Sequence, residues 1–191
     1  MGAVGNEPEP MKGALSMKLL RLLLVAAAML VWAAPASASY FYYHRTSLIN
    51  STFEVMDNYG DWTGYIRAGS GSGSDACEHY NWIPLGYYAV YWHDDNYAGT
   101  KIQGRVWRLS DYQCSNGVRR TELFVHSEET SGQGQSCGPA GTDYPFCWEG
   151  DHDYYSYGCI KVARQPVPSD LRQVDSFVHA YGMATDLWVF S

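Results

Sequence analysis

The chain has 191 residues, a length that favours a single domain. Its formal net charge is −7, and an acidic domain repels nucleic acid and anionic lipid, so neither is an expected partner. Apolar residues make up 46% of the chain and aromatic residues 15%, which is ample for a folded core.

The N-terminal segment predicts a secretory signal peptide. Basic residues lie ahead of and within an apolar run from Leu19 to Trp32, and small residues follow at 36–38. The run is shorter than the roughly 20 residues that a bilayer span needs, although an uncleaved membrane anchor is the alternative. We predict cleavage after Ala38, which leaves residues 39–191 as one secreted domain without stable membrane association. Because the removed segment carries three basic and two acidic residues, the net charge becomes −8.

Strands are predicted along most of the remaining chain. β-favouring residues between 40 and 57 indicate one or two early strands, and alternating Gly and Ser at 69–74 indicate a flexible loop. Asn116-Gly117 is a turn signal. A long loop, residues 132–153, precedes the last third of the domain. Further strands are expected over residues 87–92, 101–109, 121–126, 159–163 and 186–190.

One helix is predicted near the C-terminus. Its apolar positions recur at helical spacing, with Ser169 as the N-cap and Gly182 at the end. Many strands and one clear helix predict a mostly-β fold. The apolar positions of this helix are Leu171, Val174, Val178 and Tyr181.

The five cysteines predict two disulfides and one free thiol. Export implies an oxidising environment, and an odd count leaves at least one thiol over. Cys137 and Cys147 close a short loop rich in Gly and Pro, and Cys77 could pair with Cys114. This pairing, which leaves Cys159 free, is a hypothesis. In the alternative, Cys159 is buried and inert, or is itself bonded while another cysteine is free.

The free cysteine lies in a context that suits a nucleophile. Gly158 before Cys159 permits close approach of a substrate, and the amides of both residues are placed to face a developing oxyanion. A thiol nucleophile also needs a base. Of the six histidines, His126 ends an apolar strand and is followed by Ser127, whose backbone carbonyl is suited to fixing the imidazole tautomer.

Three motifs in this order resemble the catalytic domain of YkuD-like L,D-transpeptidases. In that family a histidine followed by Gly or Ser precedes a Ser-His-Gly-Cys stretch, an apolar residue and Arg or Asn. Here His126-Ser127 precedes Ser156-Tyr157-Gly158-Cys159-Ile160-Lys161. The segment from Ile83 to Tyr88 stands where the family has a Thr-Pro-x-Gly-x-Tyr/Phe segment. The resemblance covers roughly residues 53–178, and the order of the motifs makes it more specific than any one of them.

The resemblance implies a β-sandwich fold with one or two short helices, and here with a disulfide-stapled loop. It implies an enzyme that acts on peptidoglycan stem peptides through a cysteine thioester, giving 3-3 crosslinks or trimming the stem. Carbapenems acylate the cysteine of this family. Neither a metal nor an organic cofactor is required.

The resemblance also implies roles for single residues of this chain. Cys159 is the expected nucleophile and His126 its base, oriented by Ser127, while Gly158 and Cys159 supply oxyanion-hole amides. The residues expected to contact the substrate or shape its pocket are Ser156, Tyr157, Lys161 and, in the inserted loop, Trp148.

The chain departs from the family pattern at two positions. Tyr157 replaces the motif histidine, and Lys161 replaces Arg or Asn. The loop before Ser156 is also longer than usual, because of the segment between Cys137 and Cys147. We therefore expect a divergent member, in which hydrolysis replaces transfer as one option.

Two acidic patterns resemble metal ligands at first sight. These are residues 93–95 (His-Asp-Asp) and residues 151–153 (Asp-His-Asp), but neither has the spacing of a known site, so solvated loops are the preferred interpretation. Glu128 and Glu129 would raise the negative potential beside His126 and favour an imidazolium, or would be plain surface.

Two other classes of function remain as alternatives. One is a non-catalytic secreted domain that binds wall glycan through aromatic side chains, and Tyr157 in place of histidine is its best support. The other is a wall-targeting toxin with the same thiol chemistry. A free, reactive thiol at Cys159 separates the first alternative from an enzyme.

Overall fold

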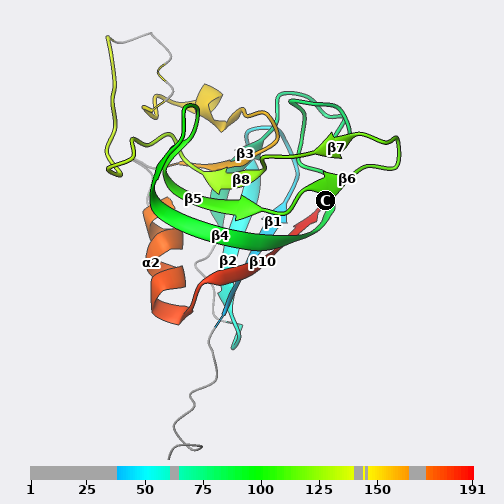
Figure 1. Cartoon of the computed structure of the whole chain (residues 1–191), viewed down its shortest axis with the longest axis horizontal. Coiled ribbons are helices and arrows are strands. Elements are labelled where there is room, and N and C mark those ends of the chain that lie inside the picture. The colour runs from blue at the N-terminus through cyan, green and yellow to red at the C-terminus, as the bar shows by residue number, and fades with distance from the viewer. Residues whose placement is uncertain (1–37, 61–64, 140–143, 145, 164–170) are drawn as a thin grey trace, which may run out of the picture. The chain divides into compact units, whose positions relative to one another are not determined.

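The computed structural model describes residues 38–60, 65–139, 144, 146–163 and 171–191 (Figure 1). Eight strands form one closed barrel in the order β1–β10–β4–β5–β8–β9–β3–β2. The barrel strands are β1 Ser39–His44, β2 Ser51–Asp57, β3 Ile66–Ser70, β4 Gly86–Ala98, β5 Gln103–Leu109, β8 Phe124–His126, β9 Ile160–Val162 and β10 Ala184–Phe190. The other elements are β6 Tyr112–Gln113, β7 Arg119–Arg120, the 3-10 helix η1 Asp151–Tyr154 and the α-helix α2 Leu171–Tyr181.

Strand β1 joins the N-terminal and C-terminal strands of the sheet into a closed barrel. It pairs in parallel with β10 and antiparallel with β2, so Phe41 lies opposite both Leu187 and Val55. Every barrel strand thereby has two neighbours. The mostly-β prediction is confirmed. The predicted β-sandwich is not found: the sheet closes on itself as a barrel, because β1 pairs with both β10 and β2, and it does not form two separate packed sheets.

The inside of the barrel is filled by side chains from alternating residues of its strands, and these side chains form the hydrophobic core. Phe41 on β1 and Phe53 on β2 are fully buried, and their rings lie 5.0 Å apart. Phe41 also meets Trp107 of β5 edge to face, at 5.6 Å between ring centroids. Burying a side chain of this size contributes about 1.5–3 kcal/mol, so these aromatic residues specify the register of three strands at once.

Helix α2 confirms the helix predicted from sequence. Leu171, Val174 and Val178 are fully buried against the barrel, as their spacing requires. The helix ends at Gly182, which adopts a φ of +107° and donates its amide to the Val178 carbonyl at 3.0 Å. The predicted N-cap, Ser169, lies outside the described residues.

The loop predicted at residues 69–74 is partly wrong, because Gly69 and Ser70 belong to strand β3. The backbone of Gly69 passes so close to η1 that a Cβ there would lie 2.5 Å from the Tyr154 carbonyl oxygen. Glycine is therefore required for packing at this position. The sequence pattern could not distinguish that requirement from the flexibility of a loop.

The predicted turn at Asn116-Gly117 is confirmed in the small hairpin of β6 and β7. Gly117 has a φ of +88°, and its amide donates to the Cys114 carbonyl at 3.1 Å. Arg120, at the end of β7, is brought back over the barrel by this turn.

Both predicted disulfides are present. Cys77 joins Cys114 with 5.8 Å between Cα atoms, and Cys137 joins Cys147 with 4.9 Å. The remaining cysteine, Cys159, is free and buried. The first disulfide fixes the β6–β7 hairpin to the segment between β3 and β4, and the second closes the long loop that follows β8.

The predicted signal peptide lies outside the described residues, apart from its last position, Ala38. It therefore stays a prediction. Within the ranges that the structure describes, no helix is both long and apolar enough to cross a membrane.

Candidate active site

Strands β8 and β9 bring the predicted nucleophile and base onto one face of the sheet. The two strands pair in parallel, with Val125 opposite Ile160 and His126 opposite Lys161. Val125 and Ile160 point into the barrel core, so the residues that alternate with them point outward. Cys159, which directly precedes β9, and His126 consequently share the outer face, two residue positions apart along the strand direction. The Cys159 thiol itself faces the Glu122 carbonyl, 3.6 Å from Sγ.

A pocket of about 720 Å³ lies on this outer face. Its floor is the second apolar cluster of the molecule, in which Cys159 packs with Val106 and Phe124. Both Cys159 and His126 are nearly inaccessible, at 6% and 5% exposure, so a reacting group has to come to them through this pocket. Residues that line it include Tyr97, Glu122, Phe124, His126, Cys159 and Lys161.

The His126 ring is oriented by the backbone of the next residue. Its Nδ1 lies 2.8 Å from the Ser127 carbonyl oxygen. Because a carbonyl only accepts, Nδ1 carries the proton in the neutral ring and Nε2 keeps its lone pair. The Ser127 carbonyl thus lies where a group that fixes the tautomer was expected from the sequence, and in this tautomer the Nε2 lone pair is the one that can accept a proton.

Burial keeps both members of the pair neutral. It lowers the pKa of His126 to about 3, assisted by the positive charge of Lys161 and opposed by the bond to the Ser127 carbonyl. It also raises the pKa of the Cys159 thiol to about 11, although nearby backbone and cationic groups oppose the change. The resting site therefore holds a thiol and an imidazole, and a thiolate–imidazolium pair is disfavoured.

The acidic residues beside His126 are neither plain surface nor a source of net negative potential at the imidazole. Glu128 forms a largely buried ion pair with Lys161. Glu129 is fully buried and pairs with Arg105, with 2.7 Å between Oε1 and Nη1. Since each carboxylate faces its own cation, the suggestion that they stabilise an imidazolium is wrong. Lys161, which was predicted to shape the pocket or hold a substrate carboxylate, is instead paired with Glu128 in this structure.

Ser156 organises the turn that carries the cysteine. Its hydroxyl accepts the Gly71 amide at 2.8 Å and donates to the Cys159 carbonyl at 2.6 Å. It also accepts the Gly158 amide at 3.1 Å, so that amide is already engaged and is not directed at a substrate oxyanion. The Gly158 amide, one of the two expected to form an oxyanion hole, is therefore used to stabilise the turn.

Gly158 is required for a steric reason. Its φ is +108°, and a Cβ there would lie 2.2 Å from Nη2 of Arg120. The Arg120 side chain is 2% exposed and is held by backbone carbonyls, including those of Asn81 at 2.9 Å and Trp82 at 3.0 Å. Burial lowers its pKa from the ordinary arginine value. Arg120 thus brings a buried guanidinium into the pocket lining.

Sequence reasoning missed Arg120, because nothing in the local pattern connects it to Cys159. The link exists only through the hairpin of β6 and β7 and the Cys77–Cys114 disulfide. The close approach of Arg120 to Gly158 is the observation that connects the two residues, and only the folded structure reveals it.

Of the two remaining residues predicted to contact the substrate, Tyr157 lies at the pocket and Trp148 lies away from it. Tyr157 is 75% exposed and packs on Tyr80, with 4.5 Å between ring centroids, at the pocket rim. Trp148 does not line this pocket. It meets Tyr154 edge to face at 4.8 Å, and Tyr154 in turn stacks under the Arg67 guanidinium.

The two acidic patterns noted in the sequence lie in different surroundings. In the first, His93 and Asp95 are joined by Asp175 of α2. The second, which lies around η1, gathers His152 and Asp153 with Glu149, and there Asp153 already accepts two backbone amides. The first pattern is therefore not the solvated loop that was expected, because residues 93–95 belong to strand β4. The second is largely solvated as expected, with Asp151 and His152 exposed, although residues 151–153 form part of η1 and Asp153 is buried.

The buried His126 predicts a loss of stability in acid. Its pKa is about 3 in the folded state against 6.5 for a solvent-exposed histidine, so below pH 6.5 the unfolded chain binds a proton that the folded chain does not. The free energy of unfolding should therefore fall by about 1.4 kcal/mol per pH unit from this group as pH decreases from about 6.5 to about 4.5.

His126→Asn provides the comparison for this effect, because its amide can still donate to the Ser127 carbonyl but does not titrate. Urea unfolding of both proteins across that pH range should show the steeper decline in the parent. Equal slopes would contradict the assignment.

Scans against protein-family models, curated proteins and solved structures find no match to this chain.

Proposed function

We propose that this protein is a secreted cysteine enzyme of the L,D-transpeptidase type that acts on peptidoglycan stem peptides. One observation carries the proposal. The free Cys159 shares a pocket-facing strand surface with His126, whose ring is oriented by the Ser127 carbonyl. The order of the three sequence motifs supports the family assignment, and the two disulfides are compatible with an exported protein.

Acyl transfer in this site begins at the sulfur. The Cys159 sulfur bonds to the carbonyl carbon of the L-centre at stem position three, and its proton passes to Nε2 of His126. The C–N bond to the terminal D-amino acid then breaks, and His126 returns the proton to the departing amine. A thioester remains. Attack by the amine of a neighbouring stem gives a 3-3 crosslink, and attack by water gives trimming.

Charges around the pocket favour this sequence once a substrate is bound. Because the resting thiol is neutral, the proton leaves sulfur as the new bond forms, and negative charge then develops on the substrate oxygen. Arg120 provides positive charge at this pocket and opposes the rise in the Cys159 pKa, whereas Lys161, which also opposes that rise, is paired with Glu128. Ser156 holds the Cys159 carbonyl and so fixes the position of the nucleophile.

A wall-binding module is the second candidate, and a specific observation favours it. Exposed tyrosines line one side of the pocket, and a thiol with a pKa near 11 is a poor nucleophile at neutral pH. In that case the rings would stack on sugars and Cys159 would be a packing residue. The tyrosines are Tyr80 at 58%, Tyr155 at 42% and Tyr157 at 75% exposure.

Intact-mass measurement of the purified, unreduced protein before and after exposure to a carbapenem tests the proposal. We expect a starting mass with two disulfides, followed by a single adduct that peptide mapping places on Cys159. Incubation with a tetrapeptide stem should then release the terminal D-amino acid. An unmodified Cys159 together with binding to wall glycan would favour the binding module instead.

A further inference from the structure

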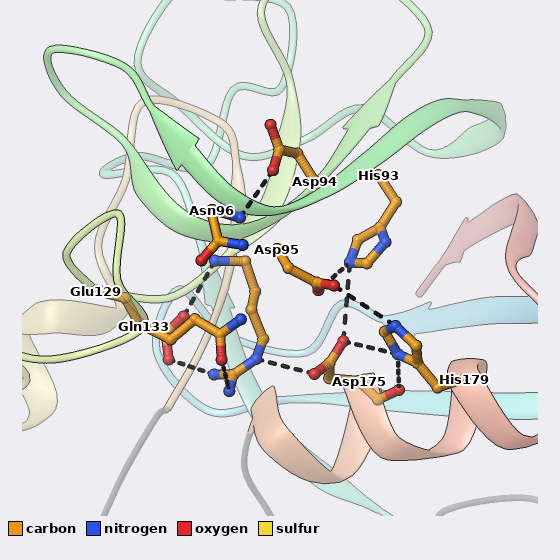
Figure 2. Close-up of polar contacts among 9 residues, drawn as sticks. His93, Asp94, Asp95, Asn96, Glu129, Gln133, Asp175 and His179 are labelled. Atoms are coloured by element: carbon orange, nitrogen blue, oxygen red, sulfur yellow. Dashed lines mark hydrogen bonds and ion pairs between the residues drawn. The ribbon is translucent and has the colours of Figure 1, made fainter.

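A second cluster of reactive side chains lies outside the pocket, where helix α2 packs beside strand β4 (Figure 2). His93 and Asp95 come from the strand, and Asp175 and His179 come from the helix. His93 Nε2 lies 3.0 Å from Asp95 Oδ1 and 3.8 Å from Asp175 Oδ1. His179 Nε2 completes the group, 3.5 Å from Asp95 Oδ2.

The centre of this cluster holds three buried polar atoms that make no hydrogen bond to the described residues. The His93 side chain is only 10% exposed. Its Nε2, together with Oδ1 of Asp95 and Oδ1 of Asp175, is buried without a hydrogen-bond partner among the described residues. The contacts these atoms make are of the ion-pair type, and Asp175 Oδ1 also lies 3.2 Å from His179 Nδ1. One potential ligand atom from each of His93, Asp95 and Asp175 lies within 4.8 Å of the other two. Buried polar atoms left in this way destabilise the fold, and a shared cation would offset that cost.

Neighbouring contacts hold these atoms in place. Arg105 donates from Nε to Oδ2 of Asp175 at 2.9 Å, which directs the other oxygen toward His93. The His93 ring stacks on the buried Trp107 ring, with centroids 4.6 Å apart and planes 19° apart. His179 Nδ1 lies 2.8 Å from the Asp175 carbonyl, so Nδ1 carries the proton and Nε2 is left with its lone pair. Metal-binding histidines are oriented by this kind of backbone contact.

The separations suit a transition metal better than a hard ion. Ligand atoms around tetrahedral Zn²⁺, with bonds of about 2.0 Å, lie about 3.3 Å apart. The separations between imidazole nitrogens and carboxylate oxygens in the cluster, 3.0, 3.8 and 3.5 Å, lie on both sides of that value. Imidazole nitrogen favours Zn²⁺ over Mg²⁺ and Ca²⁺, which prefer all-oxygen sites.

We propose that His93, Asp95 and Asp175 bind one Zn²⁺ ion, with His179 on the solvent side of the site. The ion joins helix α2 to the barrel wall and separates two carboxylates that otherwise repel each other. The site is independent of the proposed acyl transfer, since none of its four residues lines the Cys159 pocket.

Titration calorimetry of the whole chain, stripped with a chelator and then supplied with ZnCl₂, tests the site. We expect one ion per chain and a rise in the temperature of unfolding, with no comparable response to MgCl₂ or CaCl₂. Asp175→Asn and His93→Gln should each weaken the affinity at least tenfold. His179→Gln should weaken it by a smaller factor.

Matched controls separate this site from other zinc ligands in the chain. Asp94→Asn alters an exposed carboxylate next to the cluster that accepts the Asn96 amide at 2.8 Å and is not one of the proposed ligands, so it should leave the affinity close to the parent value. Cys159→Ala and His152→Gln should also leave it unchanged. Where His93→Gln fails to fold, His179→Gln, on the exposed side, decides the question. Absence of stoichiometric binding, or binding that only His152→Gln removes, would overturn the proposal.

Discussion

The Cys159→Ala variant is expected to form no covalent adduct with a carbapenem and to release no D-amino acid from a stem peptide. Without the sulfur, no thioester can form, and the other four cysteines are held in disulfides. The fold should persist, because the residue contributes one small buried side chain whose loss costs about 1 kcal/mol. Intact mass, chromatography of the released amino acid and thermal unfolding measure these three outcomes.

His126→Gln serves as the graded comparison for that variant. It keeps the nucleophile and removes the base, so acylation should slow by about 10²–10⁴ without disappearing. Turnover retained in Cys159→Ala would rule out the thiol as nucleophile. An unchanged rate in His126→Gln would assign the proton transfer to another group.

Arg105→Met should be the most destabilising of the substitutions considered. The Arg105 guanidinium is largely buried and contacts Glu129 at 2.7 Å and Asp175 at 2.9 Å. Methionine preserves much of the apolar stem but leaves the fully buried Glu129 without its cation. Removing one member of a buried ion pair typically costs about 3–5 kcal/mol, and chemical unfolding at neutral pH measures that loss.

Arg119→Met is the matched control, because it removes an arginine whose pairing is exposed. Arg119 contacts Asp111 at 2.9 Å with 67% of its side chain exposed. An exposed pair contributes about 0–1 kcal/mol, so the variant should unfold close to the parent. Similar losses in the two variants would show that burial does not set the strength of the Arg105 contacts.

Local features of this protein were predictable from its sequence because short-range rules determine them. The spacing of Leu171, Val174 and Val178 specified helix α2, and Gly182 specified its end. The odd cysteine count pointed to a free thiol, and Ser127 directly follows His126, so its carbonyl is within reach of the ring.

Features that depend on distant residues were not predictable. Asp175 is 82 positions from His93, and no periodicity connects a helix residue to a β4 residue across the fold. Arg120 reaches Gly158 only because a hairpin and a disulfide carry it there. Gly69 was interpreted as flexible, although close packing against Tyr154 is what requires glycine.

The protonation states of the site were also inaccessible from sequence. Adjacent acidic residues suggested an imidazolium, but burial of His126 outweighs them and their charges are taken up by Lys161 and Arg105. Whether a nearby carboxylate changes the pKa of His126 depends on which cation that carboxylate pairs with in the folded protein.

The position of β10 in the barrel has a consequence for how the chain folds. Ala184–Phe190 lies between β1 and β4, so Ser39 pairs with a residue 145 positions later. Until those residues are available, β1 and β4 each present an unpaired edge, and the closing step has to overcome the entropy of a very long loop. Sheets dominated by such distant pairings fold in about milliseconds to seconds, so premature termination before β10 should give an open, aggregation-prone sheet in place of a smaller stable domain.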